Sequence, residues 1–268
     1  MSSLSDVLAA ARAEGRAALI GYLPAGYPSV DGAAAAMVAM VEARVDIVEV
    51  GLPYSDPLMD GPTIQAAVEV ALQHHTTTDD VLTSVRAVAD TGAPALVMSY
   101  WNPILRRGVR RFAGEMSEAG GSGVITPDLT PDEAGDWLEA SDETGLDRVF
   151  LVAPSSTDDR LRYTAEHCRG FVYAASTMGV TGTRTTVGHA AEKLVARTRA
   201  VTDLPVCVGL GVSSGDQAAE VAGFADGVIV GSAFVRRMLD APTAAAGSAA
   251  VADLAAELAD GVRRPKRP

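Results

Sequence analysis

Cysteine is scarce in this chain of 268 residues, which contains only Cys168 and Cys207. No CxxC pair and no Cys/His spacing of the kind that holds zinc is present, so the sequence predicts no metal site. Cys207 lies in an apolar run and is interpreted as a small buried side chain.

Positive charge is also scarce: 22 Lys and Arg stand against 34 Asp and Glu, for a net charge of −12. A strongly acidic chain is a poor candidate for binding nucleic acid or an anionic membrane surface. The one basic cluster lies in the tail, residues 262–268, which is interpreted as a disordered terminus.

Long hydrophobic runs are missing as well. No segment approaches the roughly 20 apolar residues of a membrane-spanning helix. Residues 1–15 carry Asp6, Arg12 and Glu14 and are typical of an amphipathic helix, not of a signal peptide. We therefore expect a cytoplasmic protein. Neither GxGxxG nor a P-loop lysine motif occurs, so a dinucleotide-binding fold is not indicated.

What the sequence does contain is a repeated alternation of short apolar runs and helical segments. Eight apolar runs start near residues 17, 46, 94, 122, 148, 170, 205 and 226. A strand followed by a helix about every 30 residues predicts parallel βαβ units, and eight such units predict a (β/α)8 TIM barrel. No linker divides the chain, so residues 1–268 are predicted to form one domain with an extra N-terminal helix. The alternative, a doubly wound open sheet, would be unusually wide.

Helices are predicted over 32–44, 62–74, 78–91, 108–119, 131–144, 158–168, 188–200 and 215–222, with further helices at the end of the chain. The segment WNPILRRG, residues 101–108, is expected to be a connection without regular structure.

The second strand and its loop, DIVEVGLPYSDPLMDGP (46–62), form the most unusual stretch. Glu49 is a charged residue inside a β-branched run, and burial would raise its pKa toward the range of a general acid–base. Asp60 follows in the Gly- and Pro-rich loop that leaves the same strand end. The alternative to a catalytic role is that Glu49 is a surface charge at the edge of the sheet. The loop favours two carboxylates that converge on one pocket, because barrel active sites lie at the C-terminal strand ends.

Glycine-rich segments follow the sixth, seventh and eighth strands. Gly211 and the pair Gly231-Ser232 follow the last two, where barrels often bind phosphate, although each segment taken alone could be a tight turn. The long sixth loop, with Thr181 and Gly182, could close as a lid. Asp128 could cap a helix or belong to the site. Tyr173 is a core residue by default, on the same strand face as Phe171.

The run VEVGLPYSDPLMDGPTIQ closely resembles the signature of the tryptophan synthase α subunit. The resemblance continues through GYLPAGYP, MSYWNP, PDLTPDE, APSSTDDR, MGVTGTR, GLGVS and GSAFV, one segment at each of the other seven strand ends. It implies a phosphate-binding barrel that cleaves indole-3-glycerol phosphate to indole and glyceraldehyde 3-phosphate. It also implies that the indole passes to a pyridoxal-phosphate-dependent β subunit in an α2β2 complex, and that this chain itself uses no cofactor.

The same resemblance assigns roles to particular residues. Glu49 matches the catalytic acid–base and Asp60 the catalytic aspartate. In the family, the loop after the second strand faces the β subunit. The chain departs from the usual pattern in three places: Tyr22 stands where many members have Phe, Met59 replaces Ala next to Asp60, and the segment 120–123 differs before the fourth strand. The remaining matched residues contact substrate: Tyr22, Tyr173, Thr181, Gly182, Gly211, Gly231 and Ser232.

Two other functions remain open from sequence. The chain could be a stand-alone indole-3-glycerol-phosphate lyase that needs no partner, or a catalytically idle regulatory partner of a β subunit.

Overall fold

The computed structural model describes residues 3–175, 184–209 and 211–264. For residues 184–187 it describes the backbone only. Within these ranges nine parallel strands form one sheet in the order β5-β4-β3-β2-β1-β9-β8-β7-β6. The strands are β1 (Ala18–Pro24), β2 (Ile47–Gly51), β3 (Ala95–Met98), β4 (Gly123–Ile125), β5 (Asp147–Val149), β6 (Leu151–Val152), β7 (Val172–Ala175), β8 (Val206–Gly209) and β9 (Gly227–Val230).

The two end strands of this order are halves of one predicted strand. β5 pairs with β4 and β6 pairs with β7, and only Phe150 separates them in the chain. The Phe150 carbonyl accepts the Tyr173 N–H (3.2 Å), so hydrogen bonding continues through the interruption. The sheet therefore closes on itself, which confirms the predicted TIM barrel and excludes the open doubly wound sheet.

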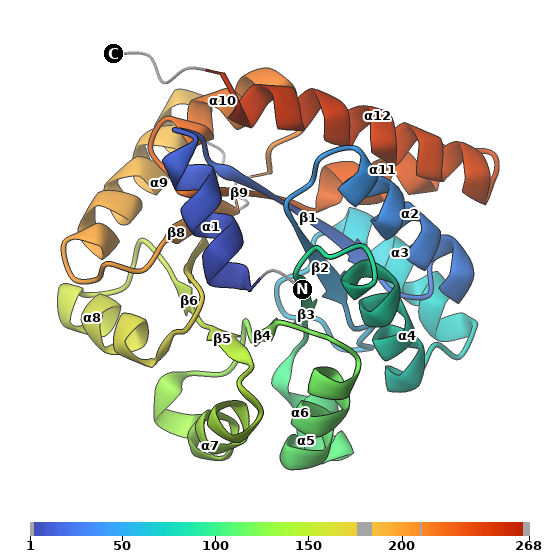
Figure 1. The fold of residues 1–268 in the computed structure, drawn as a ribbon, viewed down its shortest axis with the longest axis horizontal. Coiled ribbons are helices and arrows are strands. Elements are labelled where there is room, and N and C mark those ends of the chain that lie inside the picture. Colours follow the sequence, from blue (N-terminus) through green and yellow to red (C-terminus); the bar gives the residue numbers. More distant parts are fainter. Residues whose placement is uncertain (1–2, 176–183, 210, 265–268) are drawn as a thin grey trace.

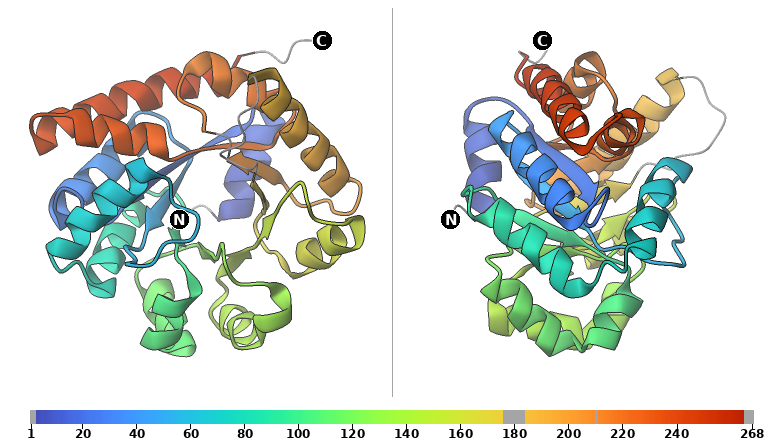
Figure 2. Two further views of the ribbon diagram at one scale, coloured as in Figure 1. Left: turned by 180° about the vertical axis from the view of Figure 1, so that it is seen from behind. Right: turned by 90° about the vertical axis from the view of Figure 1, so that its right-hand side faces the viewer.

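Helices surround the barrel, and Figures 1 and 2 show them as an outer ring with α12 along one side. They are α1 (Leu4–Ala13), α2 (Val30–Glu42), α3 (Pro62–Gln73), α4 (Thr78–Ala89), α5 (Trp101–Arg107), α6 (Val109–Glu118), the 3-10 turn η1 (Pro131–Glu133), α7 (Gly135–Thr144), α8 (Asp158–His167), α9 (Arg184–Arg199), α10 (Gly215–Ala222), α11 (Ser232–Asp240) and α12 (Ala244–Val262).

Strand side chains alternate between two apolar layers, as expected for strands buried on both faces. One layer lies between the sheet and the helices. The other fills the barrel interior and includes Ile47, Leu96 and Phe171. Leu4 and Leu8 of α1 belong to the interior cluster, so the predicted N-terminal helix covers the end of the barrel at which the strands start, called the lower end below; in Figure 1 this helix lies across the front of the barrel.

Charged residues at the lower end fasten the strand starts. Asp46 accepts the Leu19 N–H (2.8 Å) and pairs with Arg16 (2.8 Å), and Asp226 accepts the Val206 N–H (2.9 Å). Both carboxylates thus satisfy a backbone donor of the adjacent strand. In barrels this end contributes stability, while chemistry is located at the opposite end.

Three expectations need correction. Residues 101–107 form α5 instead of an irregular connection, because Asp128 Oδ1 accepts the Trp101 N–H (2.9 Å) and caps this helix from a distant loop. Helix α9 begins at 184, four residues before the predicted start. The tail expected to be disordered from residue 262 is described only at its start, where α12 reaches Val262 and Arg264 forms an ion pair with Asp216; residues 265–268 lie outside the described residues.

Candidate functional site

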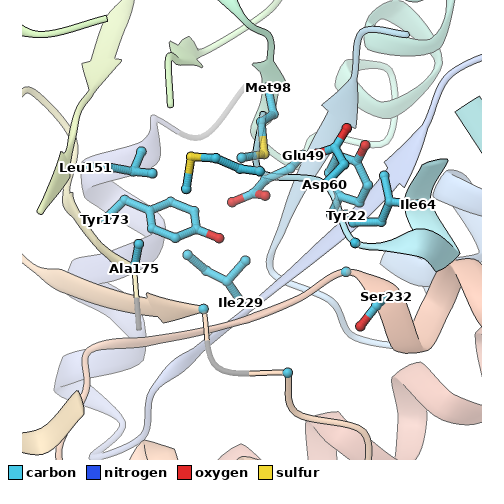
Figure 3. A pocket seen from close by; sticks show the side chains of 15 residues that line it. Tyr22, Glu49, Asp60, Ile64, Met98, Leu151, Tyr173, Ala175, Ile229 and Ser232 are labelled. Atoms are coloured by element: carbon cyan, nitrogen blue, oxygen red, sulfur yellow. The ribbon is translucent and has the colours of Figure 1, made fainter. Parts of the chain in front are cut away.

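A pocket lies at the C-terminal ends of the strands and has a volume of about 150 Å³ (Figure 3). Every predicted site residue that the structure describes lines it, and the side chains come from both sides of the barrel. Thr181 and Gly182, the two other predicted residues, lie outside the described residues. The predicted residues that line the pocket are Tyr22, Glu49, Asp60, Tyr173, Gly211, Gly231 and Ser232.

Glu49 is the central side chain of the pocket. It lies at the middle of β2, is fully buried, and neither carboxyl oxygen has a hydrogen-bond partner among the described residues. Burial alone raises its pKa to about 8, because the charged form loses its hydration. Glu49 therefore carries a proton at neutral pH and can both donate and recover it. The sheet-edge interpretation of this residue is excluded, since β2 lies between β1 and β3.

Asp60 approaches the same pocket from the loop after β2. Its carboxyl is partly buried, and burial raises its pKa, whereas a hydrogen bond from Tyr100 works in the opposite direction. The Gln65 side chain donates to the Asp60 carbonyl oxygen (2.6 Å) and so connects this residue to the start of α3. The two predicted carboxylates thus converge on one pocket from a strand and from a loop (Figure 3).

Tyr100 is a site residue that the sequence analysis missed. It follows β3 and directly precedes α5, and its hydroxyl donates to Asp60 Oδ1 (3.3 Å) and accepts the Met59 N–H (2.8 Å). Two signals in the sequence could have found it: its position two residues after a strand end, at the same end of the barrel as Asp60, and its place in the family-like segment MSYWNP.

Two tyrosines each lie over a glycine of a neighbouring strand. A β-carbon at Gly51 would lie 2.3 Å from the Tyr22 hydroxyl oxygen, and one at Gly209 would lie 2.5 Å from that of Tyr173. These glycines therefore make room for the aromatic rings. Tyr173 is both an interior core residue, close to Phe171 (ring centroids 6.5 Å apart), and part of the pocket wall.

Burial raises the pKa of both pocket tyrosines well above the usual phenol value, with smaller contributions from the nearby carboxyl groups. Tyr22 and Tyr173 are therefore neutral near pH 7. The rest of the pocket wall is apolar, a surface suited to a flat ring system. It is formed by Ile64, Met98, Leu151, Ala175 and Ile229.

Another part of the pocket wall has backbone suited to an anion. Gly211 has φ +63, a left-handed conformation that favours glycine. Gly231 precedes α11, which starts at Ser232, and no described side chain caps this helix. Its first helical hydrogen bond runs from the Val235 N–H to the Gly231 carbonyl (3.1 Å), so the earlier N–H groups remain available to a phosphate.

Two uncertain residues of the sequence analysis are also placed. Asp128 caps α5 and does not line the pocket. The Met59 side chain is 55 % exposed at the pocket rim. Over the described ranges, no group of three or more His, Cys, Asp and Glu side chains could hold a metal ion. No described helix is long and apolar enough to cross a membrane.

The parallel barrel is of the (β/α)8 class, and its C-terminal end carries two carboxylates and backbone of the kind that binds anions. Comparison with known proteins identifies the family. The family model of the tryptophan synthase alpha chain matches residues 8–263. The chain thus belongs to the tryptophan synthase alpha chain family.

Relatives support this assignment over the full length. The tryptophan synthase alpha chain of Thermobifida fusca is 60% identical and both chains are covered completely. That of Streptomyces coelicolor is 61% identical over 97% of this chain and 96% of its own. Among solved structures, Mycobacterium tuberculosis tryptophan synthase superposes with a TM-score of 0.91 at 56% identity, covering 98% of this chain and 99% of that chain.

Proposed function

We propose that the chain cleaves indole-3-glycerol phosphate to indole and glyceraldehyde 3-phosphate, and that Glu49 and Asp60 carry the reaction. The observation that carries this proposal is the pocket itself. An apolar cavity brings together a buried Glu49 with no hydrogen-bond partner among the described residues, the second carboxylate of Asp60, and a helix N-terminus that no described side chain caps. As a member of its family the chain is a lyase-type enzyme of tryptophan synthesis, and the pocket supports this particular reaction.

The proposed cleavage is a retro-aldol step. Protonated Glu49 gives its proton to indole C3, and the bond between C3 and the glycerol chain breaks. The electrons of that bond return to the indole ring, while the adjacent hydroxyl becomes the aldehyde carbonyl. The proton of that hydroxyl passes to the Glu49 carboxylate, so the enzyme ends in its starting state. A pKa of about 8 suits a group that gives a proton first and recovers it last.

Asp60 has a different role in this proposal. Positive charge develops on the indole nitrogen once C3 is protonated, and an ionised carboxylate that accepts the indole N–H stabilises this charge. The phosphate bound at Gly211, Gly231 and Ser232, with Gly182 of the sixth loop beside them, anchors the far end of the substrate, and Thr181 of the same loop contacts the substrate as part of the lid. The binding energy of the phosphate then orients the reacting end. Tyr22 and Tyr173 line the ring-binding part of the pocket.

A partner surface is proposed around the loop after β2. Large apolar side chains are exposed there and on α5: Leu58 is 78 %, Met59 55 % and Leu105 52 % exposed. The two segments lie side by side, because Asn102 of α5 donates to the Tyr54 hydroxyl of the loop (3.2 Å). An apolar patch next to the catalytic loop suits a protein partner that receives indole.

The proposed partner is a tryptophan synthase β subunit in an α2β2 complex, and the pyridoxal phosphate belongs to that subunit. This chain needs no cofactor for the cleavage, and the proposed location is the cytoplasm.

Indole release tests these proposals. The purified chain is assayed with indole-3-glycerol phosphate, alone and with a tryptophan synthase β subunit from a close relative. Slow release that the partner accelerates supports the proposal. Equal rates would indicate a stand-alone lyase, and no release in either assay would indicate an idle regulatory subunit.

A further inference from the structure

Tyr100 does not line the pocket itself but lies behind Asp60, and the surrounding structure holds it firmly in place. Its backbone continues from β3, where the Ser99 N–H donates to the Ile125 carbonyl (3.1 Å), into α5, whose first N–H is capped by Asp128. The ring is 5 % exposed and packs against that of Tyr54, with centroids 5.4 Å apart. Its hydroxyl is therefore held in place by the strand end and by a neighbouring ring.

The two hydrogen bonds of this hydroxyl define an orientation. It accepts the Met59 N–H at 2.8 Å, so its own hydrogen is directed to Asp60 Oδ1 at 3.3 Å. A donor on Oδ1 leaves Oδ2 and the remaining lone pairs for another donor, such as a substrate N–H. It also favours the ionised form of Asp60 against the burial that disfavours it.

We propose that Tyr100 is a positioning residue for Asp60: its hydroxyl joins the loop after β2 to the end of β3 and presents the Asp60 carboxylate, charged and oriented, to the substrate. This inference rests on the proposed function, because it assigns a task to Asp60 in the cleavage.

Other titratable groups surround Asp60 and belong in the argument. Tyr22 of β1 and Glu49 of β2 contribute to the same pocket, and both are neutral near pH 7 because burial raises the pKa of each. Among the described side chains, Tyr100 alone donates a hydrogen bond to the Asp60 carboxyl. It is therefore the group whose removal should change the titration of Asp60 directly.

The test compares Tyr100→Phe with the wild type and with Tyr163→Phe, a control on α8 outside the pocket whose ring lies near His167. The phenylalanine keeps the packing against Tyr54 and removes only the hydroxyl. The first measurement is the titration of Asp60, followed by the carboxyl carbon-13 signal of labelled aspartate and assigned with Asp60→Asn. We expect the Asp60 pKa to rise in Tyr100→Phe and to stay at the wild-type value in Tyr163→Phe.

The second measurement is the pH profile of indole release. In Tyr100→Phe, we expect kcat near pH 7 to fall about ten-fold or more, as for the loss of a hydrogen bond to a charged group. The acidic limb of kcat/KM should move to higher pH while phosphate affinity is unchanged. A merely structural role would lower the melting temperature without moving either titration.

The outcomes separate the two proposals. If the wild type releases no indole, the proposed function fails, and the carbon-13 titration still decides the role of Tyr100. The positioning role is overturned if the wild type is active and Tyr100→Phe leaves the Asp60 pKa unchanged and kcat within about two-fold of the wild-type value.

Discussion

The hydroxyl of Tyr173 occupies the space in which a side chain at Gly209 would begin. A β-carbon there would lie 2.5 Å from the hydroxyl oxygen and 3.1 Å from the nearest ring carbons. Both residues line the pocket, so the position of the ring depends on the absence of a methyl group on the adjacent strand.

Gly209→Ala is therefore expected to displace the Tyr173 ring. Overpacking of this kind costs about 1–3 kcal/mol of unfolding free energy, and kcat/KM for indole release should fall. The double variant Gly209→Ala/Tyr173→Phe lacks the hydroxyl with which the new methyl group clashes. Its melting temperature should therefore lie above that of Gly209→Ala. A double variant no more stable than Gly209→Ala would place the strain elsewhere.

Glu49→Gln is expected to abolish most turnover. The amide is nearly isosteric but cannot transfer a proton, and such a role contributes about 10²–10⁴-fold to the rate. The fold, followed by circular dichroism, and the affinity for glycerol 3-phosphate should be unchanged. A variant that retains more than about a tenth of the wild-type kcat would exclude direct proton transfer by Glu49.

The buried carboxyl of Glu49 also predicts how stability depends on pH. Its pKa is about 8 in the folded chain and near the ordinary value of 4.5 in the unfolded chain, so between these values the folded state binds more protons. The free energy of unfolding then decreases as pH rises from about 4.5 to 8. Glu49→Gln has no carboxyl to ionise, so it should become more stable relative to the wild type toward pH 8 and above. Denaturant curves of the wild type and of Glu49→Gln at pH 5 and pH 8.5 measure the difference in unfolding free energy between them. A difference that is the same at both pH values would contradict this prediction.

Asp60→Asn is expected to lower kcat by about 10- to 100-fold, as for the loss of a hydrogen bond to a charged group. Substrate binding through the phosphate should be retained. Asp159→Asn is the matched control, because this aspartate is 95 % exposed on α8 and far from the pocket. Unchanged kcat in Asp60→Asn would assign Asp60 a structural role in its loop.

Gly211→Ala separates backbone strain from anion binding. Gly211 (φ +63) and Gly92 (φ +88), a turn glycine with no neighbour that a β-carbon would meet, both have left-handed backbone. Alanine should destabilise the fold at either position by about 1–2 kcal/mol. Isothermal titration with glycerol 3-phosphate should show weaker binding only for Gly211→Ala. Equal affinities in both variants would remove Gly211 from the phosphate site.

The strand alternation of the sequence was sufficient to predict the barrel, and Glu49 could be singled out because a carboxylate in a β-branched run is rare without a reason. Helix α5 was missed because Pro103 near its start suggested an irregular connection, and its cap comes from Asp128 across a loop. Tyr100 was missed for a similar reason: its partner Asp60 is 40 residues away in the chain. Contacts of this range depend on how neighbouring loops fold together, which no local pattern encodes.

Helix α1 has a consequence for the passage of molecules through the barrel. Leu4 and Leu8 join the apolar side chains that fill the interior below Glu49, so the lower end is packed with protein. In the proposed reaction, substrate and products would therefore enter and leave at the opposite end of the barrel, where the pocket and the exposed Leu58 and Met59 lie. The proposed partner, seated on that rim, would cover this entrance and receive indole as it leaves the pocket.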